Sequence, residues 1–359
     1  MFTTSIGVFV FGLLAAIAGG AVGAAIGGNY AFVLTGFCVL ASWGVFAATG
    51  NTFGLDYLAF GPFMGPHVAF AGGVAAAIYA RYRGRLGDGK DVNTPLAGIG
   101  HPDILCVGAA FGIVGYVCQI GISNIPWFGK HTDPVALTVL LSGLLARLIF
   151  GGVPGKGLFH GSLHNPELFH ENATSFPAKI KPGPNGRWLE WQEKPSQLLT
   201  IGSLFGIFAG GASLFLAANV GAYLTTRGLA NTLAAANANS FCFGISAVII
   251  LFLITNRNMP VQHHVTNIAG LAAVQFFPLL MGKTFTTYHW TYTSSWDSHT
   301  WGMATVALAI AAFFGVFTAG LGEFCARLWY NRGTSHIDPP AAAIWLGNTV
   351  VVSLATLFS

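Results

Sequence analysis

The segment His131-Thr132-Asp133-Pro134-Val135-Ala136 returns later in the chain as His336-Ile337-Asp338-Pro339-Pro340-Ala341. Each copy has the pattern His-x-Asp-Pro and leads directly into an apolar stretch. Asp followed by Pro is a typical helix start, because Asp accepts a hydrogen bond at the N-cap and Pro fits the first helical position. The two copies therefore predict two helices of one kind, 205 positions apart.

Further pairs of residues recur in the same order along the chain. They are separated by offsets of 197 to 204 residues: Phe37-Cys38 with Phe241-Cys242, His67-Val68 with His264-Val265, and His101 with His299. In the His-Val pairs, a glycine follows the histidine after six residues in both copies, at Gly73 and Gly270. Repeated features in register indicate a duplicated structural unit.

The composition is that of a membrane protein. Only 8% of the 359 residues are charged, 53% are hydrophobic, and the mean hydropathy is +0.63. A soluble domain has about 25% charged residues. The 48 glycines fit the close approach of helices in lipid. The net charge of +4 does not indicate nucleic acid, because the basic residues gather in a few loops as in membrane proteins.

Apolar runs of about 20 residues, the length that spans a bilayer, predict ten transmembrane helices. We expect them at 5–27, 31–50, 64–81, 102–122, 134–152, 198–222, 236–255, 262–282, 302–325 and 340–358. The fold class is therefore an all-α polytopic membrane protein. The third and eighth runs begin near proline and polar residues, and 51–66 could form a re-entrant half-helix.

The repeat divides the chain into two five-helix membrane units. Residues 1–153 form the first, 154–197 form a polar cytoplasmic connector, and 198–359 form the second. Because five is odd, the second unit enters the membrane from the opposite side. This predicts an inverted repeat, a design in which solute sites usually lie near the midplane between the repeats.

The positions of Lys and Arg predict the orientation in the plasma (inner) membrane. Thirteen of the 16 basic residues lie in segments on one side, and three lie on the other, namely Lys130, Arg227 and Lys283. Cytoplasmic loops carry the excess of positive charge. Both termini are therefore expected outside the cytoplasm.

This architecture resembles five-plus-five inverted-repeat transporters and channels, the urea-transporter type among them. The likeness covers the number of spans and the repeat order over most of the chain. It implies a solute path between the repeats. The chain lacks a copy of the Pro/Thr-rich signature expected of urea transporters, so the resemblance does not extend to their substrate.

His67 and His264 are the first candidates for solute binding. Each begins a helix in a segment that contains proline, and Asn267 lies one turn further on. A helix that begins at membrane depth presents free N–H groups to a solute, and an imidazole beside it can exchange a proton or a hydrogen bond. His101 and His299 precede the fourth and ninth spans, each near an Asp that we interpret as a helix cap.

Asp133 and Asp338 have two interpretations. Helix capping explains both residues fully. Alternatively, together with His131 and His336, they form a symmetric pair of gates or proton sites. Under the expected topology the two pairs would lie at opposite membrane faces.

The connector contains His160-Gly-Ser-Leu-His164 and His170. His-x-x-x-His occurs in the metal-binding boxes of membrane desaturases and hydroxylases, and His263-His264 could complete such a site. Glu323, near the end of the ninth span, is either an intramembrane functional group or the partner of Arg327 four residues later.

The leading hypothesis is a transporter or channel for a small polar or ionic solute, functioning as a homo-oligomer in the lipid bilayer. The alternatives are an intramembrane enzyme with a histidine-bound metal and a structural or assembly subunit. No nucleotide, zinc-finger or nucleophile motif is present in the sequence. The sequence thus identifies neither a cofactor nor the solute, and an enzyme is the less favoured class.

Overall fold

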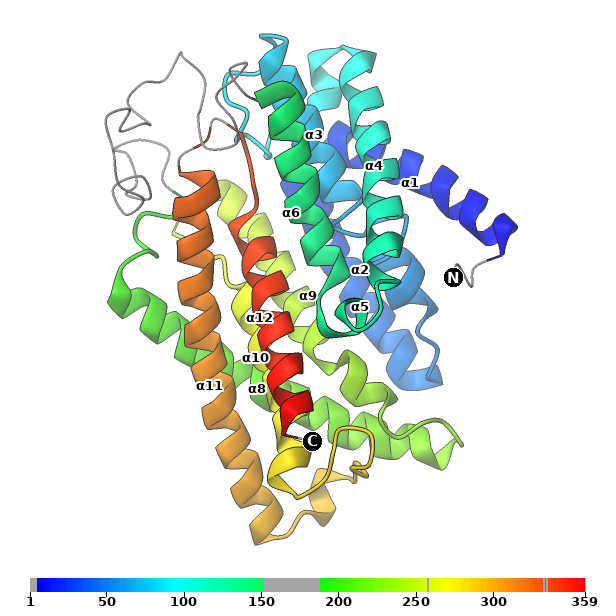
Figure 1. The fold of residues 1–359 in the computed structure, drawn as a ribbon, viewed down its shortest axis with the longest axis vertical. Coiled ribbons are helices and arrows are strands. Elements are labelled where there is room, and N and C mark those ends of the chain that lie inside the picture. The colour runs from blue at the N-terminus through cyan, green and yellow to red at the C-terminus, as the bar shows by residue number, and fades with distance from the viewer. Residues whose placement is uncertain (1–4, 152–187, 257, 332, 334, 359) are drawn as a thin grey trace.

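The computed structural model describes residues 5–151, 188–256, 258–331, 333 and 335–358. Within these residues the protein is built from helices, with no strand longer than a single bridge between Gly89 and Ser335. Figure 1 shows the helices as one bundle, with α11 and α12 side by side.

The first half begins with two long helices, α1 (Ile6–Ile26) and α2 (Gly28–Thr49). The chain between 50 and 68 is broken and contains only the π-helical turn η1 (Gly54–Ala59). The remaining elements are α3 (Ala69–Tyr82), η2 (Leu96–Ile99), α4 (Pro102–Ser123), the short α5 (Phe128–His131), and α6 (Pro134–Ala146) with its extension η3 (Arg147–Gly151).

The second half follows the same order of helices. It contains α8 (Pro195–Thr226), α9 (Leu233–Thr255), α10 (His263–Leu280), η5 (Thr293–Ser295), α11 (Ser298–Cys325) with its extension η6 (Ala326–Tyr330), and α12 (Pro339–Leu357). The break before α10 is shorter than the one before α3, with seven residues against nineteen between the flanking α-helices. The five main helices of each half lie close to the predicted runs.

Eight helices of the described residues are long and apolar enough to cross a membrane, where the sequence predicted ten. The two that do not qualify are α3 and α10. With 14 residues, α3 is about 21 Å long at 1.5 Å per residue, against roughly 30 Å for a bilayer core. Most residues of α3 and α10 are buried, so both lie inside the bundle.

The glycines allow helices of the same half to pack with their backbones in contact. A Cβ atom at Gly20 of α1 would overlap the carbonyl oxygen of Gly108 in α4. In the second half, a Cβ at Gly315 of α11 would overlap the carbonyl oxygen of Gly202 in α8. Small residues serve this purpose in lipid, where backbone packing drives helix association.

Two helices of the first half pack against their counterparts in the second. In the α2–α9 seam, the indole Nε1 of Trp43 donates to Ser240 Oγ at 2.8 Å, and Gly36 lies against Ala247. In the α6–α12 seam, Thr349 Oγ1 lies 3.1 Å from Thr132 Oγ1. Both pairs of helices run antiparallel, because residues later in one helix contact residues earlier in the other.

Large apolar side chains cover the outside of the bundle. More than half of the side chain is exposed at Phe11, Leu14, Leu148, Ile149, Leu199, Leu204 and Phe313. A soluble monomer rarely exposes apolar area on this scale. Together with the eight long helices, this surface is that of a protein made for lipid.

The tryptophans near the helix ends differ in their surroundings. Trp127 and Trp301 are exposed, whereas Trp290 and Trp296 are buried in a cluster with Phe277. The rings of Trp290 and Trp296 therefore contribute to packing within the fold.

Candidate functional site: a cavity between the two halves

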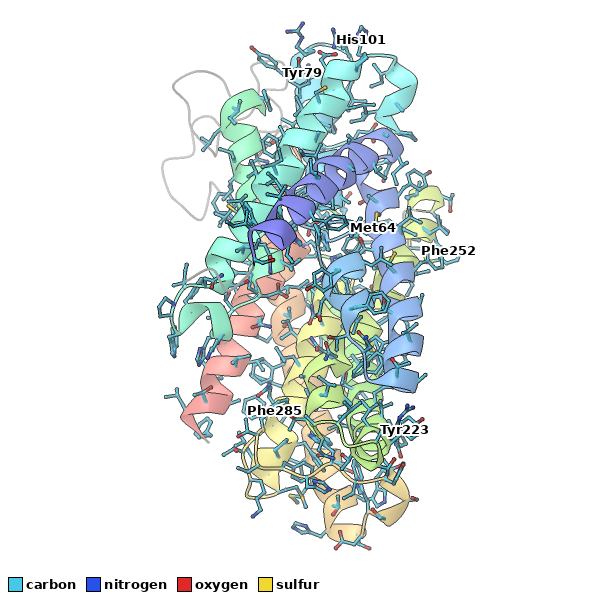
Figure 2. All side chains as sticks on the ribbon, turned by 90° about the vertical axis from the view of Figure 1, so that its right-hand side faces the viewer. Met64, Tyr79, His101, Tyr223, Phe252 and Phe285 are labelled. Atoms are coloured by element: carbon cyan, nitrogen blue, oxygen red, sulfur yellow. The ribbon has the colours of Figure 1, made fainter. Side chains whose placement is uncertain are left out.

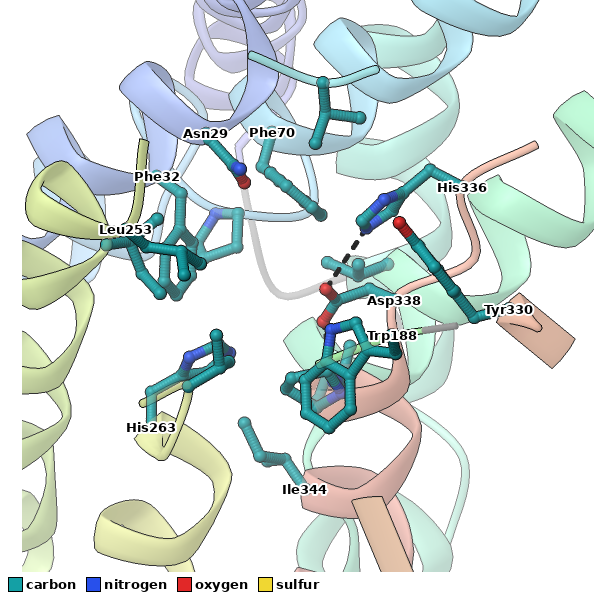
Figure 3. Close-up of a pocket in the computed structure, with 18 of the residues that line it drawn as sticks. Asn29, Phe32, Phe70, Trp188, Leu253, His263, Tyr330, His336, Asp338 and Ile344 are labelled. Carbon is teal, nitrogen blue, oxygen red and sulfur yellow. Dashed lines mark hydrogen bonds and ion pairs between the residues drawn. The ribbon is translucent and has the colours of Figure 1, made fainter. Parts of the chain in front are cut away.

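A cavity of about 790 Å³ opens between the halves. It is lined by residues near the starts of α2, α3, α6, α10 and α12, by the inner face of α9, and by the segments 88–93 and 188–191. Figure 3 shows side chains from both halves facing one another across it. Its volume is within the roughly 300–1,000 Å³ typical of small-molecule sites.

Two of the helix starts at the cavity are capped by aspartate. Asp133 Oδ1 accepts a hydrogen bond from Ala136 N at 2.8 Å, and Asp338 Oδ2 accepts one from Ala341 N at 2.7 Å. The predicted N-caps of α6 and α12 are thus confirmed. Both carboxylates line the same cavity. The two helices run antiparallel, so each begins beside the middle of the other: Thr132 contacts Thr349, and a Cβ atom at Gly143 would lie 3.5 Å from Ile337.

His336 lies beside Asp338, with its Nε2 atom 3.3 Å from Asp338 Oδ1. Its buried ring is in edge contact with Phe70 and with Tyr330. Within the described residues its Nδ1 atom is buried without a hydrogen-bond partner. Figure 3 shows His336 and Asp338 on the wall opposite His263.

His263 is the histidine of the His263-His264 pair that lines the cavity. It is 5% exposed, and its ring centroid lies 4.7 Å from that of Phe32 and 5.9 Å from that of Phe243. Its Nδ1 is another buried nitrogen with no partner among the described residues. An aromatic cluster therefore holds this imidazole at the start of α10.

Two pairs of amides add polar groups to the wall. Asn239 Nδ2 donates to Asn267 Oδ1 at 2.5 Å, and Asn29 Nδ2 donates to Asn93 Oδ1 at 2.6 Å. Asn267, a predicted site residue, thus lines the cavity.

The lining side chains carry more negative than positive charge. Among the described residues they include four carboxylates, Asp88, Asp133, Glu190 and Asp338, and one lysine, Lys90. The Lys90 ammonium lies 4.6 Å from the ring centroid of Tyr330. Burial lowers the pKa of Lys90 to about 8, because a desolvated ammonium loses hydration.

His67 and His264 are not among the residues that line the cavity. Both are almost fully buried, and neither ring has a hydrogen-bond partner in the described structure. The His67 backbone lies against Gly115 of α4, and the His264 ring lies against Gly322 of α11. The His67 backbone and the His264 ring thus each contact the fourth helix of their own half.

The other predicted histidines lie away from the cavity. His101, exposed, is at one end of the molecule, as Figure 2 shows, and His299 is exposed near the start of α11. His131 stacks on Trp127 with ring centroids 4.3 Å apart, and its Nδ1 lies 2.7 Å from the Trp127 carbonyl oxygen. The structure does not bring these residues to the cavity.

The two Asp residues near His101 and His299 behave differently. Asp297 caps α11 as expected, accepting from Thr300 N at 2.8 Å, and these hydrogen bonds lower the pKa of its carboxyl group. Asp103 does not act as a cap. It pairs instead with Arg85 at 2.7 Å and accepts from the Tyr79 hydroxyl at 2.9 Å.

The predicted partner of Glu323 is confirmed. Arg327 Nε lies 2.6 Å from Glu323 Oε1, four residues earlier on the helix. Of the suggested metal ligands, His160, His164 and His170 lie outside the described residues. Within the part of the chain that the structure describes, no group of three His, Cys, Asp or Glu side chains could hold a metal ion.

A set of polar contacts ties the halves together at the Arg147 end of α6. The buried guanidinium of Arg147 donates to Ser335 Oγ at 2.6 Å, to the Ser335 carbonyl at 2.6 Å and to the Trp329 carbonyl at 2.8 Å. Trp188 N donates to Asn331 Oδ1 at 2.7 Å. These contacts fix the segments that carry Trp188, Tyr330 and His336 into the cavity.

The helices, their lengths and their apolar exterior define a helical multi-pass membrane protein. The chain belongs to a family of unknown function, DUF7973, whose model matches residues 3–359. No curated protein and no solved structure matches the chain.

Proposed function

We propose that this protein is a transporter or channel for a small polar or ionic solute, which binds in the cavity between the two halves. The observation that carries the proposal is the lining itself. Paired helix starts from both halves, with Asp133 at α6 and Asp338 at α12, border one cavity that holds polar groups inside an apolar bundle. Polar groups at such depth are costly in lipid, and they mark solute pathways.

The α2–α9 seam supports an inverted repeat as the basis of this function. An offset of 204 residues relates Gly36 to Ser240 and Trp43 to Ala247. The observed contacts are Trp43 with Ser240 and Gly36 with Ala247. Each contact is the counterpart of the other, which is the reciprocity that a two-fold axis requires.

The α6–α12 seam follows the same rule. With the motif offset of 205, Thr132 corresponds to Ile337, and Thr349 corresponds to position 144. Thr349 contacts Thr132, and a Cβ atom built on Gly143 would lie 3.5 Å from Ile337 Cγ1. The two contacts are again reciprocal within one residue. Antiparallel counterparts at both seams are the arrangement expected of an axis in the membrane plane.

The short helix α3 supports a site at membrane depth. Its 14 residues span about 21 Å, less than the apolar layer of a bilayer. It begins at the cavity and extends away from it. With its far end at the membrane surface, the cavity would lie within the apolar layer, where broken backbone such as 50–68 is tolerated only around an internal space.

The proposal is tested by reconstitution. The purified protein in liposomes is assayed for uptake of a panel of small cations, anions and neutral amides, with Asp338→Asn as the site variant. Asn retains helix capping, so a loss of uptake reports on the cavity charge. Asp297→Asn, a cap outside the cavity, is the matched control. If no solute of the panel crosses faster than through protein-free liposomes, the proposal is rejected.

The orientation remains part of the proposal, with both termini outside the cytoplasm. Single cysteines placed at Lys130 and Lys194, in a background without the five native cysteines, test it. In intact cells an impermeant thiol reagent should label the cysteine at 130 and leave the one at 194 unlabelled. The reverse pattern would invert the assignment.

A further inference from the structure

The size of the cavity limits what it can bind. A volume of about 790 Å³ is far larger than a single dehydrated ion needs, and it corresponds to a molecule of several heavy atoms. The described residues also lack any group of three side chains that could ligate a metal. The ligand is therefore a molecule, and a bare metal ion does not fit this lining.

The charges of the lining favour a cation. The lining contains four carboxylates and one lysine. Asp88 and Glu190 are exposed and lie where the cavity meets the surface. An anion would approach against this negative rim, whereas a cation would be attracted to it. Inside, Asp133 and Asp338 cap the starts of α6 and α12, and the second oxygen of Asp338 lies 3.3 Å from His336 Nε2.

The aromatic residues of the lining add a second preference. Seven aromatic side chains take part: Phe32, Phe60, Phe70, Trp188, Trp191, Phe243 and Tyr330. The faces of such rings attract ammonium groups, most strongly when water is excluded. One primary ammonium is already held in this way, since Lys90 Nζ lies over the Tyr330 ring.

The two imidazoles of the lining are incompletely paired. His263 and His336 are both more than nine-tenths buried and lie on opposite walls of the cavity, both in the second half of the chain. Each keeps a buried Nδ1 with no partner among the described residues. A buried polar atom normally has a hydrogen-bond partner, so these nitrogens set this wall apart from ordinary packing.

From these four observations we infer that the cavity binds a small organic cation with an ammonium group, held by the carboxylate of Asp338 and the aromatic wall, with Asp133 adding negative charge to the lining. The ammonium contacts the Asp338 carboxylate and the ring faces, and its apolar part packs on Phe32 and Phe243. The inference rests on the proposed function, for which it names the class of solute.

Binding to the protein in lipid nanodiscs tests the inference by calorimetry. The probes are benzylammonium, benzyl alcohol and benzoate, which have nearly the same size and differ in charge. We expect benzylammonium to bind at least about tenfold more tightly than the other two, because 1.4 kcal/mol of charge attraction corresponds to a factor of ten. Equal binding of all three, or tighter binding of benzoate, would overturn the inference.

Variants locate the binding. Asp338→Asn keeps the cap and removes a cavity charge, and we expect it to weaken benzylammonium binding about tenfold or more. Asp297→Asn, at a capped helix start outside the cavity, should bind like the unchanged protein. An unchanged affinity in Asp338→Asn would overturn the assignment of the ammonium to this carboxylate.

The two proposals can fail separately. If benzylammonium binds in an Asp338-dependent manner but no cation enters liposomes, the site stands and transport is rejected. If liposomes take up an anion or a neutral amide and benzylammonium does not bind, transport stands and the organic-cation site is rejected.

Discussion

Two pairs of helix starts, both visible as repeats in the sequence, have different surroundings in the structure. Asp133 and Asp338 begin α6 and α12, cap them, and line one cavity. His67 precedes α3, and His264 lies at the start of α10. Their rings have no hydrogen-bond partner in the described structure, and neither residue lines the cavity. Recurrence of a motif in the sequence therefore does not by itself make a residue part of the site.

The difference has a geometric cause. The aspartates sit on helices that pack against their counterparts in the other half, so both face the boundary between halves. The histidines face glycines of α4 and α11 in their own half. The capped helix starts lie at the boundary between the halves and line the cavity. The two histidines instead pack within their own halves.

We expect the largest loss of stability from a substitution in the packing around His67. A Cβ atom at Gly115 would overlap the His67 backbone, which cannot move aside easily. We expect Gly115→Ala to lower the free energy of unfolding by about 3 kcal/mol, measured by thermal unfolding in detergent. Gly121→Ala on the same helix has open space around the new methyl group and should be neutral or slightly stabilising. Equal stability of the two variants would disprove the close contact.

The capping role of the aspartates comes next. Asp338→Ala removes the acceptor for Ala341 N and should cost about 1 to 2 kcal/mol of stability. Asp338→Asn should cost little, because Asn is an equally good cap. The same contrast is expected at Asp133. If both substitutions at one position destabilise alike, the carboxylate charge, and not the cap, stabilises that helix start.

Replacing His264 should change the stability by a smaller amount and should raise it. His264→Leu replaces a buried ring that has no hydrogen-bond partner in the described structure and should raise stability by about 1 kcal/mol. Solute uptake should be retained. His263→Leu, one position earlier and inside the cavity lining, should reduce uptake. Loss of uptake in His264→Leu with normal uptake in His263→Leu would contradict the distinction drawn between the two pairs.

The seam between α6 and α12 should show the smallest change. Thr349→Val removes the hydroxyl that lies 3.1 Å from Thr132 Oγ1, while keeping the shape of the side chain. Hydrogen bonds between membrane helices contribute about 0.6 kcal/mol, and we expect a loss of that size in the unfolding free energy. The double variant with Thr132→Val should cost no more than the single one if the two hydroxyls bind each other.

Most of the helices could be predicted from the sequence because their apolar runs are long and their starts are marked. The predicted run 102–122 became Pro102–Ser123, and 5–27 became Ile6–Ile26. The exceptions are α3 and α10, which are apolar enough to resemble spans but short and buried. An apolar run that faces other helices has the same composition as one that faces lipid, so the sequence could not separate the two cases.

The cavity was harder to predict because it depends on helix phase and on contacts between distant segments. The sequence marked His263 and His264 as neighbours, but only the direction of each side chain decides which one faces the cavity. Lys90 and Trp188 lie in connecting segments whose sequence is typical of surface loops. Their positions depend on the Trp188–Asn331 bond and on contacts near Gly89 and Ser335, which span more than 140 positions in the chain.

The buried Arg147 has a consequence for the synthesis of the chain. Its guanidinium donates to Ser335, which is added 188 residues later. At 5–20 residues per second, a ribosome takes roughly 10 to 40 s to reach that residue. Throughout this interval the nascent first half carries an arginine at the end of α6 whose Ser335 and Trp329 acceptors do not yet exist. The packing of the first five helices is therefore complete only after the loop before α12 has been synthesised.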